Sequence, residues 1–230
     1  MKVALLLTGF PRTYKRTFDN LKSNILDVHD VDTYICTWDK CQLKSGQPPV
    51  DVDMEDLINT YQENLFSYRF INYEKYNANR FESIQFLDRP WDVFKTDPRA
   101  IEHGSYWVER LRDQWYIVKE SFSMIHRPER YDLIMRLRFD IDLIDIKLDS
   151  TKELVIPKDI GGWSYSDHFV YGRVPFMKKY CNVFDEFYRM YEEYNIDISH
   201  AVDLLKFYMT DYKTSVNTFT DETIRYTIIK

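Results

Sequence analysis

Near its start the chain reads Val3-Ala4-Leu5-Leu6-Leu7-Thr8-Gly9-Phe10-Pro11. A continuous apolar run is typical of a parallel strand that is buried on both faces, and the Thr-Gly-Phe-Pro sequence predicts a tight turn at its end. The next apolar residues recur every three or four positions, which predicts an amphipathic helix: Tyr14, Phe18, Leu21 and Ile25. Residues 33–38 are rich in β-branched and aromatic residues and predict a second strand. This strand-helix-strand opening favours an α/β fold with a parallel sheet.

The rest of the chain continues as a mixture of predicted helices and strands. Helices are expected at residues 54–65, from Ser105 onwards, at 175–194 and at 201–209. Strands are expected at residues 68–72, 131–144, 154–156 and 224–229. Because no internal repeat, low-complexity tract or linker divides the sequence, residues 1–230 are expected to form a single domain.

The composition is that of an ordinary globular protein. Of the 230 residues, 44% are hydrophobic and 17% aromatic, which is enough for a core that needs no disulfide or structural metal. The formal net charge of -6 argues against a nucleic-acid partner, because affinity for the phosphate backbone comes from clustered Lys and Arg. Positive charge for a phosphate ligand therefore has to be supplied locally.

Neither the cysteines nor the N-terminus indicates an exported or membrane protein. The 3 cysteines show no framework spacing, which favours a reducing compartment. The apolar start reaches Gly9, Pro11 and Arg12 without a signal-peptide cleavage site, and no apolar stretch approaches the roughly 20 residues of a membrane span. We expect a cytoplasmic protein with no transmembrane segment.

Residues 131–144 carry the most informative pattern. Apolar residues alternate there with Arg136, Arg138, Asp140 and Asp142, and this period of two predicts one continuous strand with its charged side chains on one face. Residues i and i+2 of a strand lie roughly 6.5 Å apart, so the two aspartates can bind one cation or its hydration shell. Mn²⁺ and Mg²⁺ prefer oxygen ligands and take substrate phosphates at their remaining positions.

The same pattern has a second interpretation. A half-exposed strand carries Arg and Asp on its outer face simply because water is there, and its ion pairs are then worth well under about 1 kcal/mol. The pattern alone therefore leaves two hypotheses, a divalent metal site at Asp140 and Asp142 and a solvated strand face.

Four segments together resemble the small glycosyltransferases of the GT-A fold, which carry an Asp-x-Asp sequence and are found in bacterial polysaccharide clusters and large DNA viruses. The segments are residues 4–13, 32–38, 131–142 with Arg138-Phe139-Asp140-Ile141-Asp142, and 167–172 with Asp167-His168-Phe169-Val170-Tyr171-Gly172. The resemblance implies one GT-A-like (Rossmann-like) domain with a central, mostly parallel sheet flanked by helices. It implies a nucleotide-sugar-binding part, residues 1–142, and an acceptor-side part, residues 143–230. For a viral protein the compartment would be the host cytoplasm.

The resemblance also implies which residues form the site. It assigns to the nucleotide-sugar Thr8, Gly9, Arg12, Asp39, Arg138 and Asp140. Asp140 and Asp142 would hold Mn²⁺ or Mg²⁺, with Asp142 as the direct ligand. Simple turn chemistry also accounts for Gly9, and a solvated surface charge accounts for Arg12.

Asp167 is the candidate catalytic base. The resemblance places this residue beside the transferred sugar and the acceptor, where a carboxylate can take the proton of the attacking hydroxyl. Asp203 is the reserve candidate, and His200 is a weaker candidate for the metal because a lone histidine at a helix start is more often structural. The alternative for Asp167 is a cap or a turn.

These observations predict a metal-dependent glycosyltransferase, a hexosyl- or related transferase. It would move a sugar from a nucleoside-diphosphate-sugar donor to a glycan, a glycoprotein or another hydroxyl acceptor. A metal-dependent phosphohydrolase or nuclease also uses paired carboxylates, but the first strand here ends Thr8-Gly9-Phe10 with no acid. A non-catalytic sugar-nucleotide-binding module is the third hypothesis.

Overall fold

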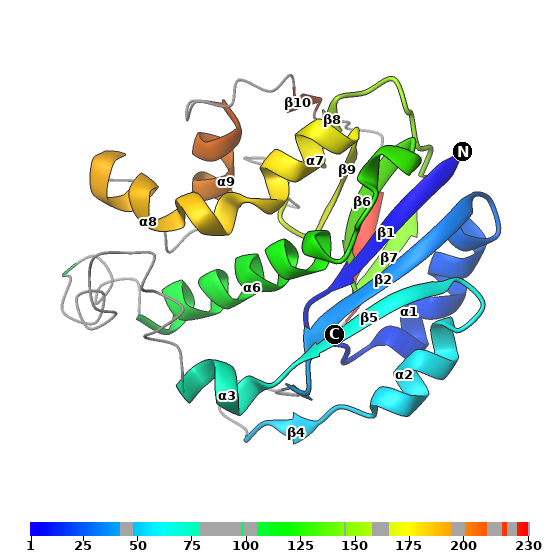
Figure 1. Ribbon diagram of the computed structural model, residues 1–230, viewed down its shortest axis with the longest axis horizontal. Helices are drawn as coiled ribbons and strands as arrows, with labels where there is room; N and C mark the ends of the chain where they lie inside the picture. Colours follow the sequence, from blue (N-terminus) through cyan, green and yellow to red (C-terminus); the bar gives the residue numbers. More distant parts are fainter. Residues whose placement is uncertain are drawn as a thin grey trace.

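The computed structural model describes residues 1–41, 48–78, 98, 105–144, 146–157, 166–194, 201–210, 218–219 and 225–229. Its centre is a sheet with the strand order β10-β8-β9-β6-β1-β2-β5 (Figure 1). The bounds are β1 Lys2–Thr8, β2 Asp30–Trp38, β5 Leu65–Ile71, β6 Leu133–Arg138, β8 Leu154–Val155, β9 Phe169–Gly172 and β10 Thr218–Phe219. Among these described strands only β9 opposes its neighbours, so the predicted α/β class with a mostly parallel central sheet is confirmed.

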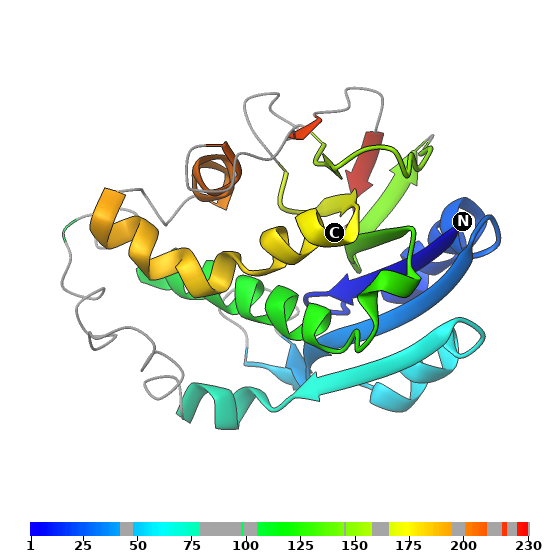
Figure 2. The same cartoon turned by 45° about the horizontal axis from the view of Figure 1, so that its top comes forward.

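Helices cover both faces of the sheet (Figures 1 and 2). One face carries α1 Tyr14–Leu21, which continues as a π-helical turn Lys22–Leu26, and α2 Met54–Tyr61. The other face carries α6 Ser105–Ser123, α7 Val174–Cys181, α8 Val183–Tyr194 and α9 Ala201–Thr210. Smaller elements are α3 Tyr73–Ala78, a 3-10 turn Pro128–Arg130, the pair β3 Lys40–Cys41 with β4 Val50–Asp51, and the pair β7 Ile141–Ile144 with β11 Arg225–Ile228.

Two hydrophobic clusters fill the layers, and β1 serves both. Ala4 and Leu6 pack with α6, α7 and α8, while Val3, Leu5 and Leu7 pack with α1 and α2. Each of these five side chains is at most 1% exposed. A strand between two helical layers has no polar face, which is why its sequence is a continuous apolar run.

The predicted strand at residues 131–144 is interrupted, so the prediction of one continuous strand is wrong. β6 ends at Arg138, Phe139 and Asp140 form a turn, and β7 begins at Ile141. β7 leaves the main sheet and pairs antiparallel with β11. Asp140 therefore lies in a turn and Asp142 in a different strand from β6, and β6 itself is buried on both faces rather than half-exposed.

Two predicted helices also have different bounds. The helix predicted at 54–65 ends at Tyr61, because the chain turns there into β5, which starts at Leu65. The helix predicted at 175–194 is two helices, α7 and α8, separated by Asn182. The backbone N–H of Asn182 still bonds to Lys178 and Lys179, and the N–H of Asp185 restarts the next helix on the Asn182 carbonyl. Among the described helices none is long and apolar enough to cross a membrane.

The strand order places a switch point between β1 and β6. The chain moves from β1 to β2 on one side, whereas β6 pairs with the other side of β1. Ligands of open α/β sheets bind outside the carboxyl ends of the strands at such a point. Because β9 runs antiparallel to β6, the residues just before β9, Asp167 and His168, lie at this same edge.

Candidate functional site

The turn after β1 forms one side of the candidate site. Gly9 has φ +100, a backbone conformation that L side chains rarely adopt, and its carbonyl accepts a hydrogen bond of 2.6 Å from Thr37 Oγ1. A Cβ on Gly9 would meet only Arg138 Cγ at 4.0 Å. The glycine is thus required by backbone conformation rather than by lack of space, and it lies beside Arg138.

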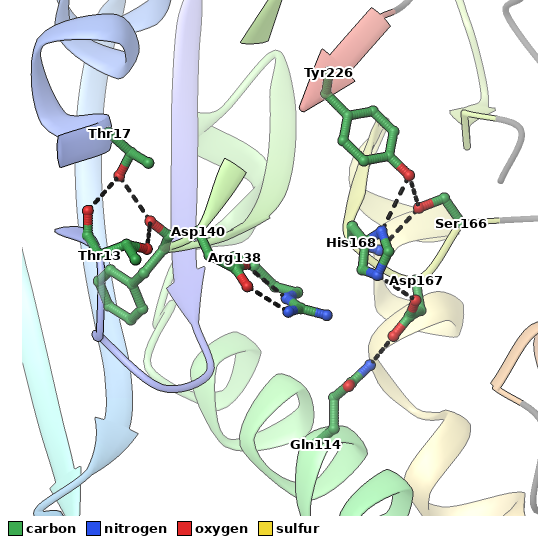
Figure 3. Close-up of polar contacts among 10 residues, drawn as sticks. Thr13, Thr17, Gln114, Arg138, Asp140, Ser166, Asp167, His168 and Tyr226 are labelled. Atoms are coloured by element: carbon green, nitrogen blue, oxygen red, sulfur yellow. Dashed lines mark hydrogen bonds and ion pairs between the residues drawn. The ribbon is translucent and has the colours of Figure 1, made fainter. Parts of the chain in front are cut away.

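Helix α1 holds the turn that follows β6. Thr17 Oγ1 donates to the carbonyl of Phe139 at 2.7 Å, and Thr13 Oγ1 donates to the same oxygen at 3.4 Å (Figure 3). The Asn20 side chain then bonds the backbone of Leu143 in β7 through its Nδ2 at 3.0 Å and its Oδ1 at 2.7 Å. These contacts of α1 are why the chain turns away from the sheet where the alternation predicted a continuing strand.

Arg138 and Asp140 form a bidentate pair within this turn (Figure 3). Arg138 Nε lies 2.9 Å from Asp140 Oδ1, and Nη2 lies 2.5 Å from Oδ2. Burial of Arg138 acts to lower the pKa of its guanidinium. The effects of Asp140, Asp167 and Tyr226 are larger together, so the pKa is raised. The pair fixes the side chains of two of the six residues that the resemblance assigned to the nucleotide-sugar, Arg138 and Asp140.

Asp142 lies in β7 opposite Thr227 of β11. Its Oδ1 is buried and accepts no hydrogen bond from the described residues. An acceptor left unpaired in the interior costs about 1–3 kcal/mol, so such an atom is typical of a site completed by a ligand or an ion.

The donor chemistry of these two aspartates suits a divalent cation. Asp142 offers a free buried oxygen, and the Asp140 carboxylate has about four lone-pair sites, so it can bind a cation while it accepts from Arg138. The described residues contain no group of three or more His, Cys, Asp or Glu side chains that could hold a metal. Substrate oxygens and water would have to fill the other positions, as is common for Mg²⁺.

Asp167 is 7% exposed and is held from two sides. Gln114 Nε2 of α6 donates a short hydrogen bond to its Oδ2, and His168 Nε2 lies 3.3 Å from its Oδ1 (Figure 3). Burial works against ionisation, but the contacts with His168 and Gln114 and the positive charges of Arg138 and Arg136 together outweigh it and lower the pKa of Asp167. The structure thus presents an ionised carboxylate in the interior.

Arg136 lies in β6, opposite Leu6 of β1, and is fully buried. Its Nε donates to Thr8 Oγ1 at 2.8 Å, while Nη1 and Nη2 find no hydrogen-bond partner among the described residues. The sequence pattern predicted this guanidinium on an open strand face, which is wrong, because α7 packs over β6. Its charge instead helps to lower the pKa of Asp167.

The structure brings Thr8, Gly9, Arg138, Asp140 and Asp167 to one edge of the sheet and places Asp142 in β7, two residues beyond Asp140. It places two other predicted residues differently. Both carboxylate oxygens of Asp39 accept bonds at the start of α3, from Tyr73 N at 2.8 Å and from Asn72 Nδ2 at 2.6 Å. Arg12 is exposed, 5.8 Å from the ring centroid of Phe10. The side chain of Asp203 and all of residue 200 lie outside the described residues.

Three further residues that the sequence did not single out contribute to the site. Gln114 on α6 bonds Asp167, and Ser166 and Tyr226 bond each other and His168. Gln114 and Tyr226 are distant from Asp167 in sequence and have no motif around them. The closing strand at residues 224–229 was predicted, but its partner β7 could not be, because that pairing joins segments far apart in the chain.

Comparisons with known proteins report a likeness among solved structures. No family model matches the chain, and no curated protein matches it in sequence. An active-site mutant of LgtC matches with a TM-score of 0.47 and 9% identity, over 97% of this chain and 86% of that one. Galactosyltransferase LgtC in complex with donor and acceptor sugar analogues matches with a TM-score of 0.42 and 10% identity, over the same shares.

Proposed function

We propose that this protein transfers a sugar from a nucleoside-diphosphate-sugar to a hydroxyl acceptor, with Mn²⁺ or Mg²⁺ as cofactor. The observation that carries the proposal is the unpaired buried oxygen of Asp142, two residues along the chain from the Arg138–Asp140 pair, which lies at the edge of the sheet that also holds Asp167. This edge combines a vacant acceptor for a cation with fixed positive charge for a phosphate. The likeness of segments 4–13, 32–38, 131–142 and 167–172 to GT-A glycosyltransferases agrees with this reading.

Each residue has a distinct task in the proposed reaction. The turn at Thr8 and Gly9 receives the nucleotide, and Arg138, held by Asp140, faces the diphosphate. In an inverting transfer the acceptor hydroxyl attacks the anomeric carbon, the bond from that carbon to the diphosphate breaks, and Asp167 takes the hydroxyl proton. The nucleoside diphosphate then leaves with the bonding electrons.

The metal would be held by Asp142 and Asp140. A bound Mn²⁺ or Mg²⁺ would supply positive charge to the diphosphate as it leaves. The protein's own part is to hold the carboxylates in place, which the Arg138 pair does for Asp140.

A donor screen tests the proposal. Several sugar nucleotides are incubated with the protein, Mn²⁺ and a panel of hydroxyl acceptors, and both released nucleoside diphosphate and glycosylated acceptor are measured. We expect release that depends on Mn²⁺ and on an acceptor, and that is lost in Asp142→Asn.

A matched control is Asp132→Asn. Asp132 lies at the amino end of β6, at the opposite edge of the sheet, where it accepts from Lys2 N at 2.7 Å. This variant removes the same charge from the same segment and should keep full transfer. Hydrolysis of the donor to nucleoside monophosphate and sugar 1-phosphate, without glycosylated product, would instead favour a phosphohydrolase, and Mn²⁺-dependent binding without turnover would favour a binding module.

A further inference from the structure

A chain of hydrogen-bonding groups connects Asp167 to the C-terminal strand β11. Tyr226 of β11 places its hydroxyl 3.1 Å from His168 Nδ1 and 2.6 Å from Ser166 Oγ (Figure 3). The other nitrogen of the same imidazole, Nε2, lies 3.3 Å from Asp167 Oδ1. One residue of β11 thus reaches the candidate base through a single intervening ring.

The donors and acceptors of this chain allow two directions, and the Asp167 carboxylate decides between them. In one direction the Ser166 hydroxyl, whose oxygen accepts from the backbone N–H of His168 at 3.1 Å, donates to Tyr226. The Tyr226 proton then goes to His168 Nδ1, which leaves the imidazole proton on Nε2. In the reverse direction Nδ1–H donates to Tyr226, and Nε2 carries no proton. An Nε2–H directs its dipole at the Asp167 carboxylate, whereas a bare Nε2 lone pair would face an anionic oxygen and repel it.

The surroundings of His168 favour the neutral form of its imidazole ring. Burial lowers the pKa of His168, and the neighbouring Arg138 and Arg136 lower it further, against the opposing effects of Asp167 and Asp140. A neutral imidazole carries one proton, so the bond at Nδ1 decides which nitrogen faces Asp167. Tyr226 also meets the His168 ring edge-on, with 5.8 Å between centroids and an interplanar angle of 76°, which restricts rotation of the ring.

The strand that carries Tyr226 also contacts the two aspartates of the proposed metal site. Thr227 is paired with Asp142, and Ile229 N donates to the carbonyl of Asp140 at 2.8 Å. The same short strand therefore supports both carboxylate groups of the site.

We propose that His168 and Tyr226 are positioning residues for Asp167: Tyr226 fixes the His168 ring with its proton on Nε2, and this ring fixes the carboxylate that takes the acceptor proton. The last step rests on the proposed glycosyl transfer, whereas the state of the imidazole does not. Neither residue is expected to touch the substrate.

The state of the imidazole is measured first, in the unliganded protein. Selective ¹⁵N labelling of histidine distinguishes the two neutral tautomers by NMR, and the signal of His168 among 5 histidines is assigned as the one missing in His168→Gln. We expect the Nε2–H form in the wild type and loss of that preference in Tyr226→Phe, which keeps the ring and removes only the hydroxyl. An Nδ1–H form in the wild type, or an unchanged tautomer in Tyr226→Phe, would overturn the proposal.

Kinetics then separate positioning from stability. Tyr226→Phe should lower kcat by about 10- to 100-fold, as is usual for residues that orient a functional group, and leave the KM for the donor within about twofold. Ile228→Ala is the control, because it weakens the packing of β11 without changing the hydroxyl. Ile228→Ala should lower the melting temperature at least as much as Tyr226→Phe does, and it should leave kcat unchanged.

Two substitutions of His168 sharpen the result. The amide nitrogen of His168→Gln can take the place of Nε2 and still donate to Asp167, so this variant should keep more activity than His168→Ala. Equal loss in both would contradict a role through Nε2. Absence of transfer in a wild type with an Nε2–H imidazole would contradict the glycosyltransferase function while supporting the positioning of Asp167.

Discussion

Asp39 comes directly after β2, and Asp142 lies in β7, a few residues after β6. The strands β2 and β6 end at the same edge of the sheet, yet the two carboxylates are in opposite situations. Both oxygens of Asp39 accept hydrogen bonds from the start of α3, whereas Oδ1 of Asp142 is buried and unpaired in the described structure. A paired acid stabilises the fold, and an unpaired buried acid costs stability until a ligand binds. We therefore propose that hydrogen-bond satisfaction, more than residue type or position, distinguishes the structural acid Asp39 from the proposed ligand-binding acid Asp142.

Asp142→Ala should have the largest effect. Removing the free oxygen takes away one of the few protein ligands available to a cation, so donor binding that depends on Mn²⁺ and turnover should both fall below detection. Apo stability should be unchanged or slightly raised, because an unsatisfied acceptor is removed. Donor titrations with and without Mn²⁺, together with thermal melts of the apo protein, measure both. A variant that still turns over in Mn²⁺ would contradict the contrast with Asp39.

Asp167→Asn should follow, with transfer reduced by roughly 10²- to 10⁴-fold, the usual contribution of a general base. The amide keeps the shape of the side chain but cannot take a proton, so donor affinity should stay nearly intact. Single-turnover transfer and equilibrium donor binding give the two numbers. Full activity of Asp167→Asn would show that Asp167 is not the catalytic base, and Asp203 would be tested next.

Gly9→Val should have an intermediate effect. The positive φ of Gly9 is unfavourable for a β-branched residue, and such strain costs about 1–3 kcal/mol. Because the turn lies at the mouth of the proposed nucleotide site, we expect nucleotide affinity to fall about 10-fold or more while the melting temperature falls little. The reverse pattern, a lower melting temperature with unchanged affinity, would remove this turn from the site.

Asp39→Ala should have the smallest effect on ligands. It deletes the acceptor for Tyr73 N and Asn72 Nδ2, so the free energy of unfolding should fall by about 1 kcal/mol, as for the loss of a helix cap. Nucleotide affinity should change less than threefold. Chemical denaturation and calorimetry decide this, and a larger loss of affinity than of stability would return Asp39 to the nucleotide site where the sequence placed it.

The sequence predicted the elements whose pattern reflects burial on both faces. The apolar run in β1 and the helix that follows it were correct, because continuous or periodic apolar residues have few other solutions. The alternation at residues 131–144 wrongly predicted one continuous strand. Phe139, Ile141 and Leu143 keep the spacing of a strand although a turn interrupts the segment, because all three pack in the same hydrophobic cluster as α1. Local spacing does not show that Thr17 and Asn20 bind this segment.

The site was predictable where residues are adjacent in the chain and unpredictable where the fold brings them together. Asp140 and Asp142 stand out in the sequence, and Asp167 was found only through a family resemblance. Gln114, Ser166 and Tyr226 carry no local signal, because their roles depend on long-range contacts with Asp167 and His168. The burial of Arg136 likewise depends on α7, which covers β6 from a distant part of the chain.

The most direct test of the proposed metal and nucleotide site is the stabilisation produced by ligands in two proteins. Wild type and Asp142→Ala are melted alone, with Mn²⁺, with UDP or GDP, and with Mn²⁺ and nucleoside diphosphate together. For the wild type we predict that the melting temperature rises only when both ligands are present. The corresponding gain in the free energy of unfolding is about 2.7 kcal/mol when the ligand is at 100 times its dissociation constant, and for Asp142→Ala we predict no gain. An equal rise in both proteins would contradict the metal site and most of the case for a glycosyltransferase.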